Sequence, residues 1–364
     1  MEIVKVDSYT LRVPIGREVG DSRLSITDCY WIVVEIETRD GTRGTGWMGS
    51  LGFAPDILSD FVESQFRDML IGRDPFETKA ISEDLRRQTI YYGELGLSAW
   101  PRSTIDVALW DIKAKVANQP LYRFLGGDQS RVRAYASSMD ARHDTDQLIN
   151  LHGEYLADGF SAFKTKVGNR SPEEEAKRVA AVRNGIGEEA ELFIDANQAW
   201  TLKETVEMLE QLAPHNIGWI EEPIREFDEA AHGRLANRLE TKLATGEMFY
   251  RLERFRRFLE LGGVDIVQPD LIRSGGITGQ LKVAELAEQF GVPVASHFYY
   301  AISSHVIAAV SNGYIVEYIP EYDIAPLLEE PPEIKDGHVV LPDEPGHGYH
   351  IKSDAKEQFR ADLS

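Results

Sequence analysis

The second half of this sequence repeats one unit, a short apolar run followed by a helical pattern. Eight apolar runs start at intervals of about 22 to 30 residues, and each but the last precedes an amphipathic segment. Two of these segments open with capping boxes, at Ser171 and at Thr201, which predict helix starts. The runs are VRAYAS, SAFKTKV, ELFIDA, IGWIEE, KLATGE, VDIVQPD, VPVASH and YIVEY. This alternation predicts an α/β fold, a modified TIM barrel of the (β/α)7β type.

The chain before this repeat combines strands with helices. VKVDSYTLRV, CYWIVVEIETRDG and TRGTGWMG alternate like strands, and Asp40-Gly41 predicts the hairpin turn between the last two. The spacing of Ile105, Leu109 and Ile112 predicts a helix over residues 103–117. The simplest arrangement is a β-meander followed by helices, which is an α+β domain.

At 364 residues, the chain is longer than one hydrophobic core usually supports. We expect an N-terminal α+β capping domain over residues 1–125 and the barrel over residues 126–326. The tail, residues 327–364, is predicted to be an extended segment that returns to the capping domain. Two polar, glycine-containing segments of the first domain, residues 16–27 and 49–54, are predicted to be mobile loops.

The second barrel strand carries two lysines on one face. In the stretch FKTKVG, Lys164 and Lys166 are two residues apart, so their side chains point the same way. Two buried ammonium groups repel each other, and each loses its hydration. An edge strand with a solvated basic face is the simple alternative, because lysine often guards exposed sheet edges. A functional face would require anions that neutralise the pair.

Polar or ionisable residues end seven of the eight predicted strands. Taken singly, each is better explained as a helix N-cap or a loop anchor. In β/α barrels, however, the carboxyl ends of the strands share one mouth, and this many charges would repel one another unless something binds there. The residues, in strand order from the second strand, are Lys164 and Lys166, Asp195 and Asn197, Glu221 and Glu222, Glu247, Asp270, His297, and Glu317.

Three of these carboxylates, Asp195, Glu221 and Glu247, end successive strands and should converge on one point of the rim. Three carboxylates plus water are the oxygen ligands that Mg²⁺ prefers. Zinc is disfavoured, because no cysteine and only one histidine is near. The trio therefore predicts a Mg²⁺ site.

With these anions present, the lysine pair can act in catalysis. Lys164 can neutralise a substrate carboxylate, while its charge lowers the pKa of Lys166 toward that of a usable base. Across the mouth, Asp270 and His297 end adjacent strands, and an aspartate bound to one imidazole nitrogen makes the other a better acid or base. Without Asp270, a core histidine would be the better explanation. Glu317 is placed to share a proton with the substrate carboxylate, although it could also be a loop anchor.

The ordered motifs KTK, DANQ, WIEEP, ATGE, QPD, ASH and VEY resemble those of the enolase superfamily, and within it the mandelate racemase subgroup. The resemblance spans essentially the whole chain and implies a capping domain, a (β/α)7β barrel and Mg²⁺ as the cofactor. The sister subgroup of muconate lactonizing enzymes has a lysine at the end of the sixth strand, which VQPDLIRSGG lacks.

The resemblance also implies a role for each matching residue. Lys166 and His297 are implied to be opposed acid/base groups, with Asp270 as the partner of His297. Lys164 and Glu317 are implied to stabilise an enediolate, and Asn197 to contact the α-hydroxyl group of the substrate. The implied metal ligands are Asp195, Glu221 and Glu247.

The shared step would be removal of the proton α to a carboxylate, giving the enediolate. Return of a proton on the opposite face gives racemisation or epimerisation, whereas expulsion of a β-hydroxyl group gives a 2-keto-3-deoxy acid. The first loop, GREVGDSRLSIT, is polar, and its Arg23 is a candidate to bind a polyhydroxylated substrate, although the loop could simply be solvated. We therefore favour dehydration of an aldonate or aldarate, with a racemase or epimerase of a 2-hydroxy acid as the alternative. A barrel that binds sugar acids without turnover is a further alternative, but it would be expected to lose at least one catalytic group.

Composition limits the partners of the protein. The net charge of -21 and the scattered basic residues argue against nucleic acid as a partner. The sequence contains no run of about 18 apolar residues, and its start lacks the order of a signal peptide, so no membrane partner is expected. The single cysteine, Cys29, fits a reducing cytoplasm. We expect a cytoplasmic homo-oligomer whose partner is a small 2-hydroxy or sugar acid.

Overall fold

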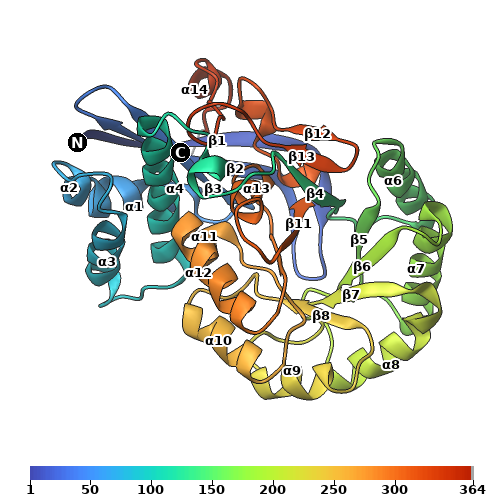
Figure 1. Ribbon diagram of the computed structural model, residues 1–364. Helices are drawn as coiled ribbons and strands as arrows, with labels where there is room; N and C mark the ends of the chain where they lie inside the picture. Colours follow the sequence, from blue (N-terminus) through green and yellow to red (C-terminus); the bar gives the residue numbers. More distant parts are fainter. Residues whose placement is uncertain (362–364) are drawn as a thin grey trace.

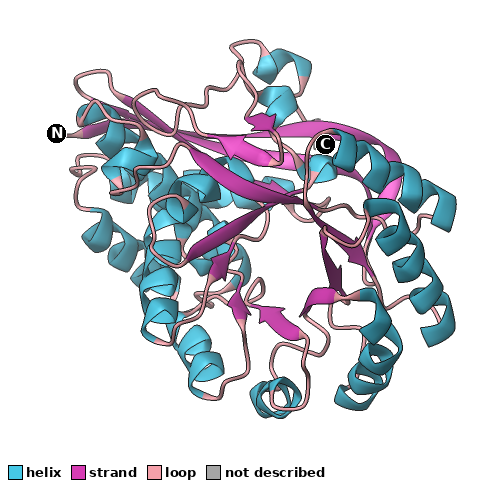
Figure 2. Cartoon of the chain, turned by 45° about the vertical axis from the view of Figure 1, so that its right-hand side comes forward, coloured by secondary structure: helices cyan, strands magenta, loops and turns pink. Residues whose placement is uncertain are grey.

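The structure, a computed structural model, describes residues 1–361 and contains the predicted barrel (Figure 1). All eight predicted strands are present and parallel, and β11 pairs with β4 to close the ring (Figure 2). The strands are β4 (Arg131–Ala136), β5 (Ala162–Lys166), β6 (Glu191–Asp195), β7 (Ile217–Glu221), β8 (Lys242–Thr245), β9 (Ile266–Val267), β10 (Val294–Ala295) and β11 (Gly313–Tyr318).

Helices surround the ring on its outer side (Figure 2). Each of the first seven strands is followed by at least one helix, as the alternation in the sequence predicted. The helices are α6 (Thr145–Ala157), α7 (Pro172–Ile186), α8 (Leu202–Leu212), α9 (Glu229–Ala236), α10 (Leu252–Glu260), α11 (Leu271–Ser274), α12 (Gly276–Gln289) and α13 (Tyr300–Ile307), with a 3₁₀ turn at Ala213–His215. Both predicted capping boxes are formed, at the starts of α7 and α8.

The interior of the barrel is apolar below its mouth. Side chains alternate across each strand, so one face packs against the helices and the other fills the ring. In the ring, the aromatic side chains of Phe193 and Trp219 stack with centroids 3.4 Å apart, and Tyr135 meets both edge to face. This packed floor leaves the carboxyl ends of the strands as the place where a ligand can enter.

The N-terminal domain is an antiparallel sheet in the order β1–β2–β3, covered by helices (Figure 1). Gly44 and Gly46 of β3 let helix α4 lie against the sheet, because a Cβ at either position would collide with the backbone carbonyl groups of Ala108 or Thr104. The elements are β1 (Ile3–Gly20), β2 (Ser25–Thr38), β3 (Arg43–Ser50), α1 (Pro55–Phe61), the π-helical turn Val62–Phe66, α2 (Arg67–Leu70), α3 (Thr78–Thr89), the 3₁₀ turn Gly96–Ser98, α4 (Ala99–Val116) and α5 (Leu121–Phe124).

The prediction of a loop over residues 16–27 was wrong for most of that segment. Strand β1 continues to Gly20 and β2 begins at Ser25, with Val19 paired to Ile26 and Gly20 paired to Ser25. The polar composition of this segment led to the prediction of a loop. The hairpin forms nevertheless, because it is held by hydrogen bonds between the two backbones, which do not depend on apolar side chains. The hairpin extends β1 and β2 toward the mouth of the barrel, where Gly20 also bridges to Asp140.

The C-terminal segment returns across the molecule and contacts both earlier parts. Strands β12 (Glu333–Lys335) and β13 (His338–Val340) form a hairpin that pairs antiparallel with β4, which the sequence analysis did not predict. Near the end of the chain, Phe359 accepts a backbone hydrogen bond from Arg12 of β1 at 2.7 Å. The 3₁₀ turns Pro320–Tyr322 and Ala325–Leu327 precede this segment, and helix α14 (Ala355–Gln358) lies within it. The boundaries placed at residues 125 and 326 stay predictions.

Within residues 1–361, the structure contains no helix with the length and apolar character needed to cross a membrane.

Candidate active site

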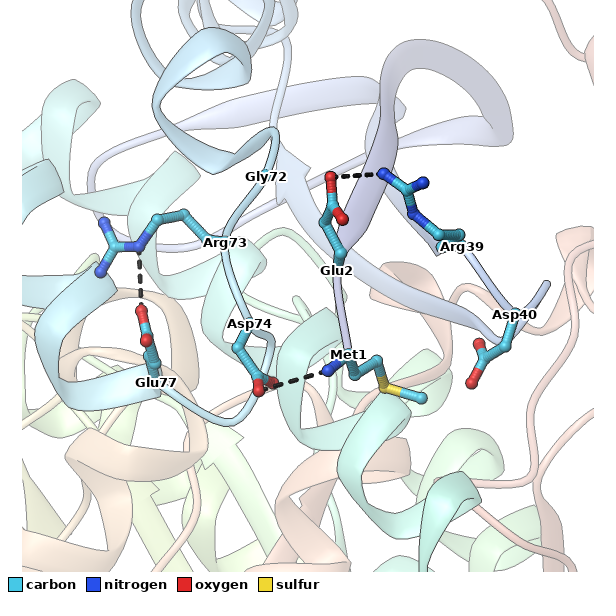
Figure 3. A pocket seen from close by; sticks show the side chains of 8 residues that line it. All are labelled: Met1, Glu2, Arg39, Asp40, Gly72, Arg73, Asp74 and Glu77. Atoms are coloured by element: carbon cyan, nitrogen blue, oxygen red, sulfur yellow. Dashed lines mark hydrogen bonds and ion pairs between the residues drawn. The ribbon is translucent and has the colours of Figure 1, made fainter.

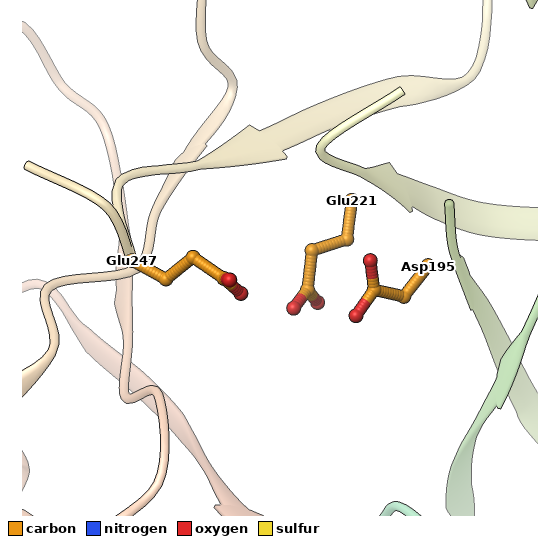
Figure 4. Close-up of side chains that lie close together, drawn as sticks. All are labelled: Asp195, Glu221 and Glu247. Carbon is orange, nitrogen blue, oxygen red and sulfur yellow. The ribbon is translucent and has the colours of Figure 1, made fainter. Parts of the chain in front are cut away.

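Three predicted site residues lie side by side at the carboxyl ends of β5, β6 and β7. In the parallel register, Lys166 is the partner of Asp195, and Asp195 is the partner of Glu221. Glu247 follows the end of β8 and extends toward the other two carboxylates from across the gap (Figure 4). Carboxylate oxygens of Asp195, Glu221 and Glu247 all lie within 4.8 Å of one another. A single small cation can therefore contact all three.

The lysine pair is buried and surrounded by these anions. Lys164 Nζ lies 2.7 Å from Glu221 and 2.7 Å from Glu317, while Lys166 Nζ lies 2.6 Å from Asp195 Oδ2. Strand β5 is hydrogen-bonded on both sides, to β4 and to β6, so it is not an edge strand. The alternative of a solvated basic face is therefore wrong, and both ammonium groups point into the barrel mouth as predicted.

The charges at the mouth shift one another's pKa values. Burial, together with the charges of Asp195 and Glu317, raises the pKa of Glu221 to about 8, although Lys164 opposes the shift. Burial also favours the neutral amine of Lys166, but the adjacent Asp195 carboxylate raises the pKa of Lys166 above its ordinary value. The charge of Lys164 lowers the pKa of Lys166, as expected, but this effect is smaller than that of Asp195. The expected net shift toward the pKa of a usable base is therefore wrong.

The carboxylate trio fits Mg²⁺ by the chemistry of its donors and by one atom without a partner. All three groups offer oxygen, which Mg²⁺ prefers. Glu247 Oε2 is buried and accepts no hydrogen bond from any of residues 1–361. A buried carboxylate oxygen that accepts no hydrogen bond is costly, and a bound cation would relieve that cost.

Asp270 and His297 meet on the other side of the mouth. They form a β-bridge just beyond β9 and β10, and His297 Nδ1 lies 2.9 Å from Asp270 Oδ2. Because a carboxylate can only accept, Nδ1–H donates this hydrogen bond and Nε2 is left to exchange a proton. His297 Nε2 lies 3.3 Å from Glu247 Oε2, so the imidazole faces the carboxylate trio rather than the core.

A cavity of about 270 Å³ opens above these groups and is lined by Lys166, Asn197, Glu247, Asp270 and His297. Arg23, predicted to bind substrate, lies at this cavity with Nη2 3.7 Å from both Asp21 and Glu247. The Asn197 side chain is buried, and its Oδ1 atom accepts no hydrogen bond within residues 1–361.

Glu317 does not line the cavity, but it pairs with Lys164 and accepts a backbone hydrogen bond from Phe298 at 3.0 Å. The structure thus brings the predicted site residues into one region.

Models of two known families match the two parts of the chain. Residues 5–126 match the N-terminal domain of mandelate racemase / muconate lactonizing enzyme, and residues 147–355 match the enolase C-terminal domain-like family. The chain belongs to the mandelate racemase/muconate lactonizing enzyme family of the enolase superfamily. The fold, the meander followed by a closed barrel, agrees with this assignment.

Relatives within the family include dehydratases and racemases. The arabinonate dehydratase of Saccharolobus solfataricus is 32% identical over 337 residues, which cover 90% of each chain. The crystal structure of L-talarate dehydratase from Polaromonas, complexed with Mg and L-glucarate, has a TM-score of 0.91 at 31% identity and covers 99% of this chain and 98% of that one. A racemase from Streptomyces coelicolor with bound magnesium has a TM-score of 0.95 at 29% identity and covers 99% of this chain and all of that one.

Two residues that support the carboxylate trio were not identified from the sequence. Gln268 Nε2 donates to Glu221 Oε2 at 2.8 Å, and Trp219 Nε1 donates to the same oxygen at 3.3 Å. The sequence contained a signal for both residues. Trp219 precedes Glu221 by two positions and Gln268 precedes Asp270 by two, and residues two positions apart in a strand point to the same face. Asp140, which accepts hydrogen bonds from the strand of the two lysines, follows β4 in a loop and gave no comparable signal.

A second cavity, of about 680 Å³, lies at the edge of the N-terminal domain (Figure 3). It is lined by charged groups that pair with each other, Arg39 with Glu2, Arg73 with Glu77, and the terminal amine with Asp74. The cavity is open and contains none of the predicted site residues. Its size alone does not make it a candidate site.

Proposed function

We propose that this enzyme removes the α-proton of a 2-hydroxy carboxylate with the help of Mg²⁺ and, in its main reaction, dehydrates a sugar acid to a 2-keto-3-deoxy acid. The observation that carries the proposal is that Lys166 and His297 reach one cavity from distant strands of the barrel, β5 and the segment after β10, beside the carboxylate trio. Two acid/base groups on different sides of a bound carbon acid are what α-proton removal followed by a second proton transfer requires.

Asp195, Glu221 and Glu247 would hold the metal ion. When bound, Mg²⁺ would supply positive charge that polarises the substrate carboxylate and makes the α-proton more acidic. The support for this assignment is the oxygen donor set and the unpartnered Glu247 oxygen, together with the magnesium named in structures of relatives.

The other residues would move protons and hold charge. One of Lys166 and His297 takes the proton from C2, and the C–H electrons pass into the C1–C2 bond of the enediolate. The Lys164 ammonium then faces the charge that develops on the carboxylate oxygens, and Glu317 keeps that ammonium in place at 2.7 Å. The opposite group protonates the C3 hydroxyl, which leaves as water, and the resulting enol tautomerises to the 2-keto acid.

Dehydration is proposed ahead of racemisation because the two sugar-acid dehydratases named above are 31 to 32% identical to this chain, whereas the racemase is 29% identical. The racemase relative keeps the second candidate open, and the two share every step up to the enediolate. They differ only in whether the second acid delivers its proton to C2 or to the C3 hydroxyl group.

The test is a screen of 2-hydroxy acids with Mg²⁺ in D₂O, in which NMR follows loss of the C2 proton and a colour reaction follows the keto acid. We expect exchange and keto acid from at least one sugar acid. Lys166→Ala and His297→Asn should each stop dehydration, while the exposed-site controls Lys203→Ala and His350→Asn should not. Racemisation of a simple 2-hydroxy acid with no keto acid from any sugar acid would support the second candidate. Exchange on no substrate at all would refute both.

The metal assignment has its own test. Glu247→Gln should weaken Mg²⁺ binding, measured by calorimetry, and the rise in melting temperature that Mg²⁺ produces should shrink with it. Exposed Glu253, on the first turn of α10, gives the matched control Glu253→Gln. Equal Mg²⁺ affinity in Glu247→Gln and in the unmodified enzyme would contradict the assignment.

A further inference from the structure

The turn that follows β6 places Asn197 at the catalytic cavity and has an unusual backbone. Asn197 and Gln198 both adopt left-handed conformations, with φ angles of 44° and 65°. Asparagine takes up this conformation more readily than most residues, whereas glutamine rarely does. Two such residues in succession therefore need contacts from outside the turn to hold them.

Glu222, the residue after β7, supplies contacts of this kind to Gln198. The Gln198 N–H donates to the Glu222 carbonyl oxygen at 2.6 Å, and Gln198 Nε2 donates to Glu222 Oε2 at 2.7 Å. Glu222 is fully buried, and its own N–H donates to the carbonyl oxygen of Ala244 in β8 at 3.0 Å. These bonds form a clamp, Gln198 with Glu222, that joins the turn after β6 to the next two strands of the barrel.

The side chain of Asn197 lies at the cavity with one polar atom free. Asn197 lines the cavity together with Lys166 and His297, and only 3% of the residue is exposed. Its N–H donates to Asp195 Oδ1 at 2.8 Å, whereas its Oδ1 atom is buried and accepts no hydrogen bond from any of residues 1–361. A buried amide oxygen without a donor is available to a hydroxyl group of a ligand.

Other bonds hold the two ends of the turn. Ser22 Oγ, from the tip of the β1–β2 hairpin, donates to the Ala196 carbonyl oxygen at 3.2 Å. The Trp200 N–H donates to the Pro223 carbonyl oxygen at 3.1 Å. The second left-handed residue lies between these bonds and is held through Glu222.

We infer that Gln198 and Glu222 are positioning residues that aim the Asn197 amide at the C2 hydroxyl group of the substrate. The inference rests on the proposed function, which supplies the 2-hydroxy acid, and on the expected contact of Asn197 with the α-hydroxyl group. Neither Gln198 nor Glu222 lines the cavity, so both act through Asn197 rather than on the substrate. A hydrogen bond that is equally strong in the complex and in the transition state favours binding and leaves kcat little changed.

The kinetic test is a double-mutant cycle at saturating Mg²⁺ on the acid that reacts in the screen. Asn197→Ala and Gln198→Ala should each lower kcat/KM by about tenfold, mainly through KM, which is the loss expected for one hydrogen bond. Because Gln198 acts through Asn197, the double variant should be no worse than Asn197→Ala alone. Gln211→Ala, at an exposed position on α8, is the control and should leave kcat/KM unchanged. Losses that multiply to about 100-fold in the double variant would overturn the inference, because Gln198 would then act independently of Asn197.

Two substitutions of Glu222 test the other half of the clamp. Glu222→Ala removes the acceptor of the Gln198 side chain and should raise KM about as much as Gln198→Ala does. Glu222→Gln keeps a carbonyl oxygen that can accept from Gln198 Nε2, so it should recover most of that loss. A Glu222→Gln variant as impaired as Glu222→Ala would show that the hydrogen bond to Gln198 is not what matters.

A structural test needs no substrate. In crystals of Gln198→Ala grown with Mg²⁺, we expect the Asn197 amide to have moved from its place at the cavity, and the carboxylate trio to have kept its positions. An Asn197 side chain in its original place would overturn the inference and leave the proposed function intact. Exchange of the α-proton on none of the acids screened would refute the proposed function instead.

Discussion

His297 is held by Asp270 through one hydrogen bond, from Nδ1 to Oδ2 at 2.9 Å, and the other oxygen of Asp270 accepts the backbone N–H groups of Ile272 and Arg273 at 2.9 and 2.8 Å. The aspartate is thus fixed by the start of α11 before it fixes the imidazole. Burial opposes ionisation of Asp270, yet Arg273 and His297 keep its pKa below the ordinary value. The ionised carboxylate selects the imidazole tautomer whose Nε2 faces the cavity.

Asp270→Asn should therefore lower kcat for the dehydration by about 100-fold or more, because the amide can donate to the imidazole and favour the wrong tautomer. KM should change little, since Asp270 contacts the histidine rather than the substrate carboxylate. Steady-state kinetics on the substrate found in the screen gives both values. Asp343→Asn, at an exposed position, is the control. A variant with unaltered kcat would show that Asp270 does not position His297 for proton transfer.

Gln268→Leu should weaken Mg²⁺ binding about tenfold, as loss of a group that orients a metal ligand commonly does. The substitution removes the 2.8 Å hydrogen bond to Glu221 Oε2 and leaves that buried oxygen with the longer contact from Trp219. Calorimetric titration of the purified protein with Mg²⁺ measures the effect without any substrate. Exposed Gln289 provides the control Gln289→Leu. An affinity equal to that of the control would mean that Trp219 alone is sufficient to orient Glu221.

Acid should destabilise the fold partly through His305. Burial and the nearby His347 lower the pKa of His305 to about 3, and both of its ring nitrogens lack hydrogen-bond partners among residues 1–361. A histidine in the unfolded chain titrates near 6.5, so the stability is fully present above that pH and is lost as the pH falls toward the folded-state pKa. At pH 5 this one group should reduce the free energy of unfolding by about 2 kcal/mol relative to pH 8.

His305→Phe should remove this contribution, so the variant should lose about 2 kcal/mol less than the unmodified protein between pH 8 and pH 5. Denaturant unfolding at the two pH values measures the difference and does not depend on the variant's absolute stability. His350→Phe, in which the replaced side chain is 49% exposed, is the control. Parallel pH profiles for His305→Phe and the unmodified protein would show that the buried imidazole is not responsible.

The residues that end barrel strands could be predicted because the strand register leaves them little freedom. Lys166, Asp195 and Glu221 are far apart in sequence, yet adjacent parallel strands that end at the same rim must bring them together. The hairpin residues were less predictable, because a polar side chain such as Glu18 pairs with its own hairpin as readily as with a ligand. The part of the cavity lining that comes from separate segments, including Leu51 and Trp100, has no pattern of its own in the sequence.

The structural role of Asp140 could not be predicted from the sequence. This residue lies in a loop after β4, and its hydrogen bonds depend on where that loop lies in the folded chain. Its Oδ1 atom accepts the backbone N–H of Lys166 at 2.8 Å, and Oδ2 accepts the hydroxyl of Thr165 at 3.0 Å. The side chain is fully buried, so these donors have no water to replace it. Asp140 therefore secures the end of β5 on the face opposite the lysine ammonium groups.

Asp140→Ala should leave the Lys166 N–H buried without an acceptor and lower the free energy of unfolding by about 1 to 3 kcal/mol. The loosened strand end should also misplace the Lys166 side chain, so kcat should fall. Mg²⁺ affinity, set by the carboxylates at the ends of β6 and β7 and just after β8, should stay nearly constant. Asp140→Asn retains one carbonyl acceptor and should recover part of both losses, which a general defect in folding would not predict. Kinetics, Mg²⁺ calorimetry and denaturant unfolding on the two variants give the three quantities. Equal losses of kcat and Mg²⁺ affinity in Asp140→Ala would show that the loop supports the whole mouth rather than the end of β5.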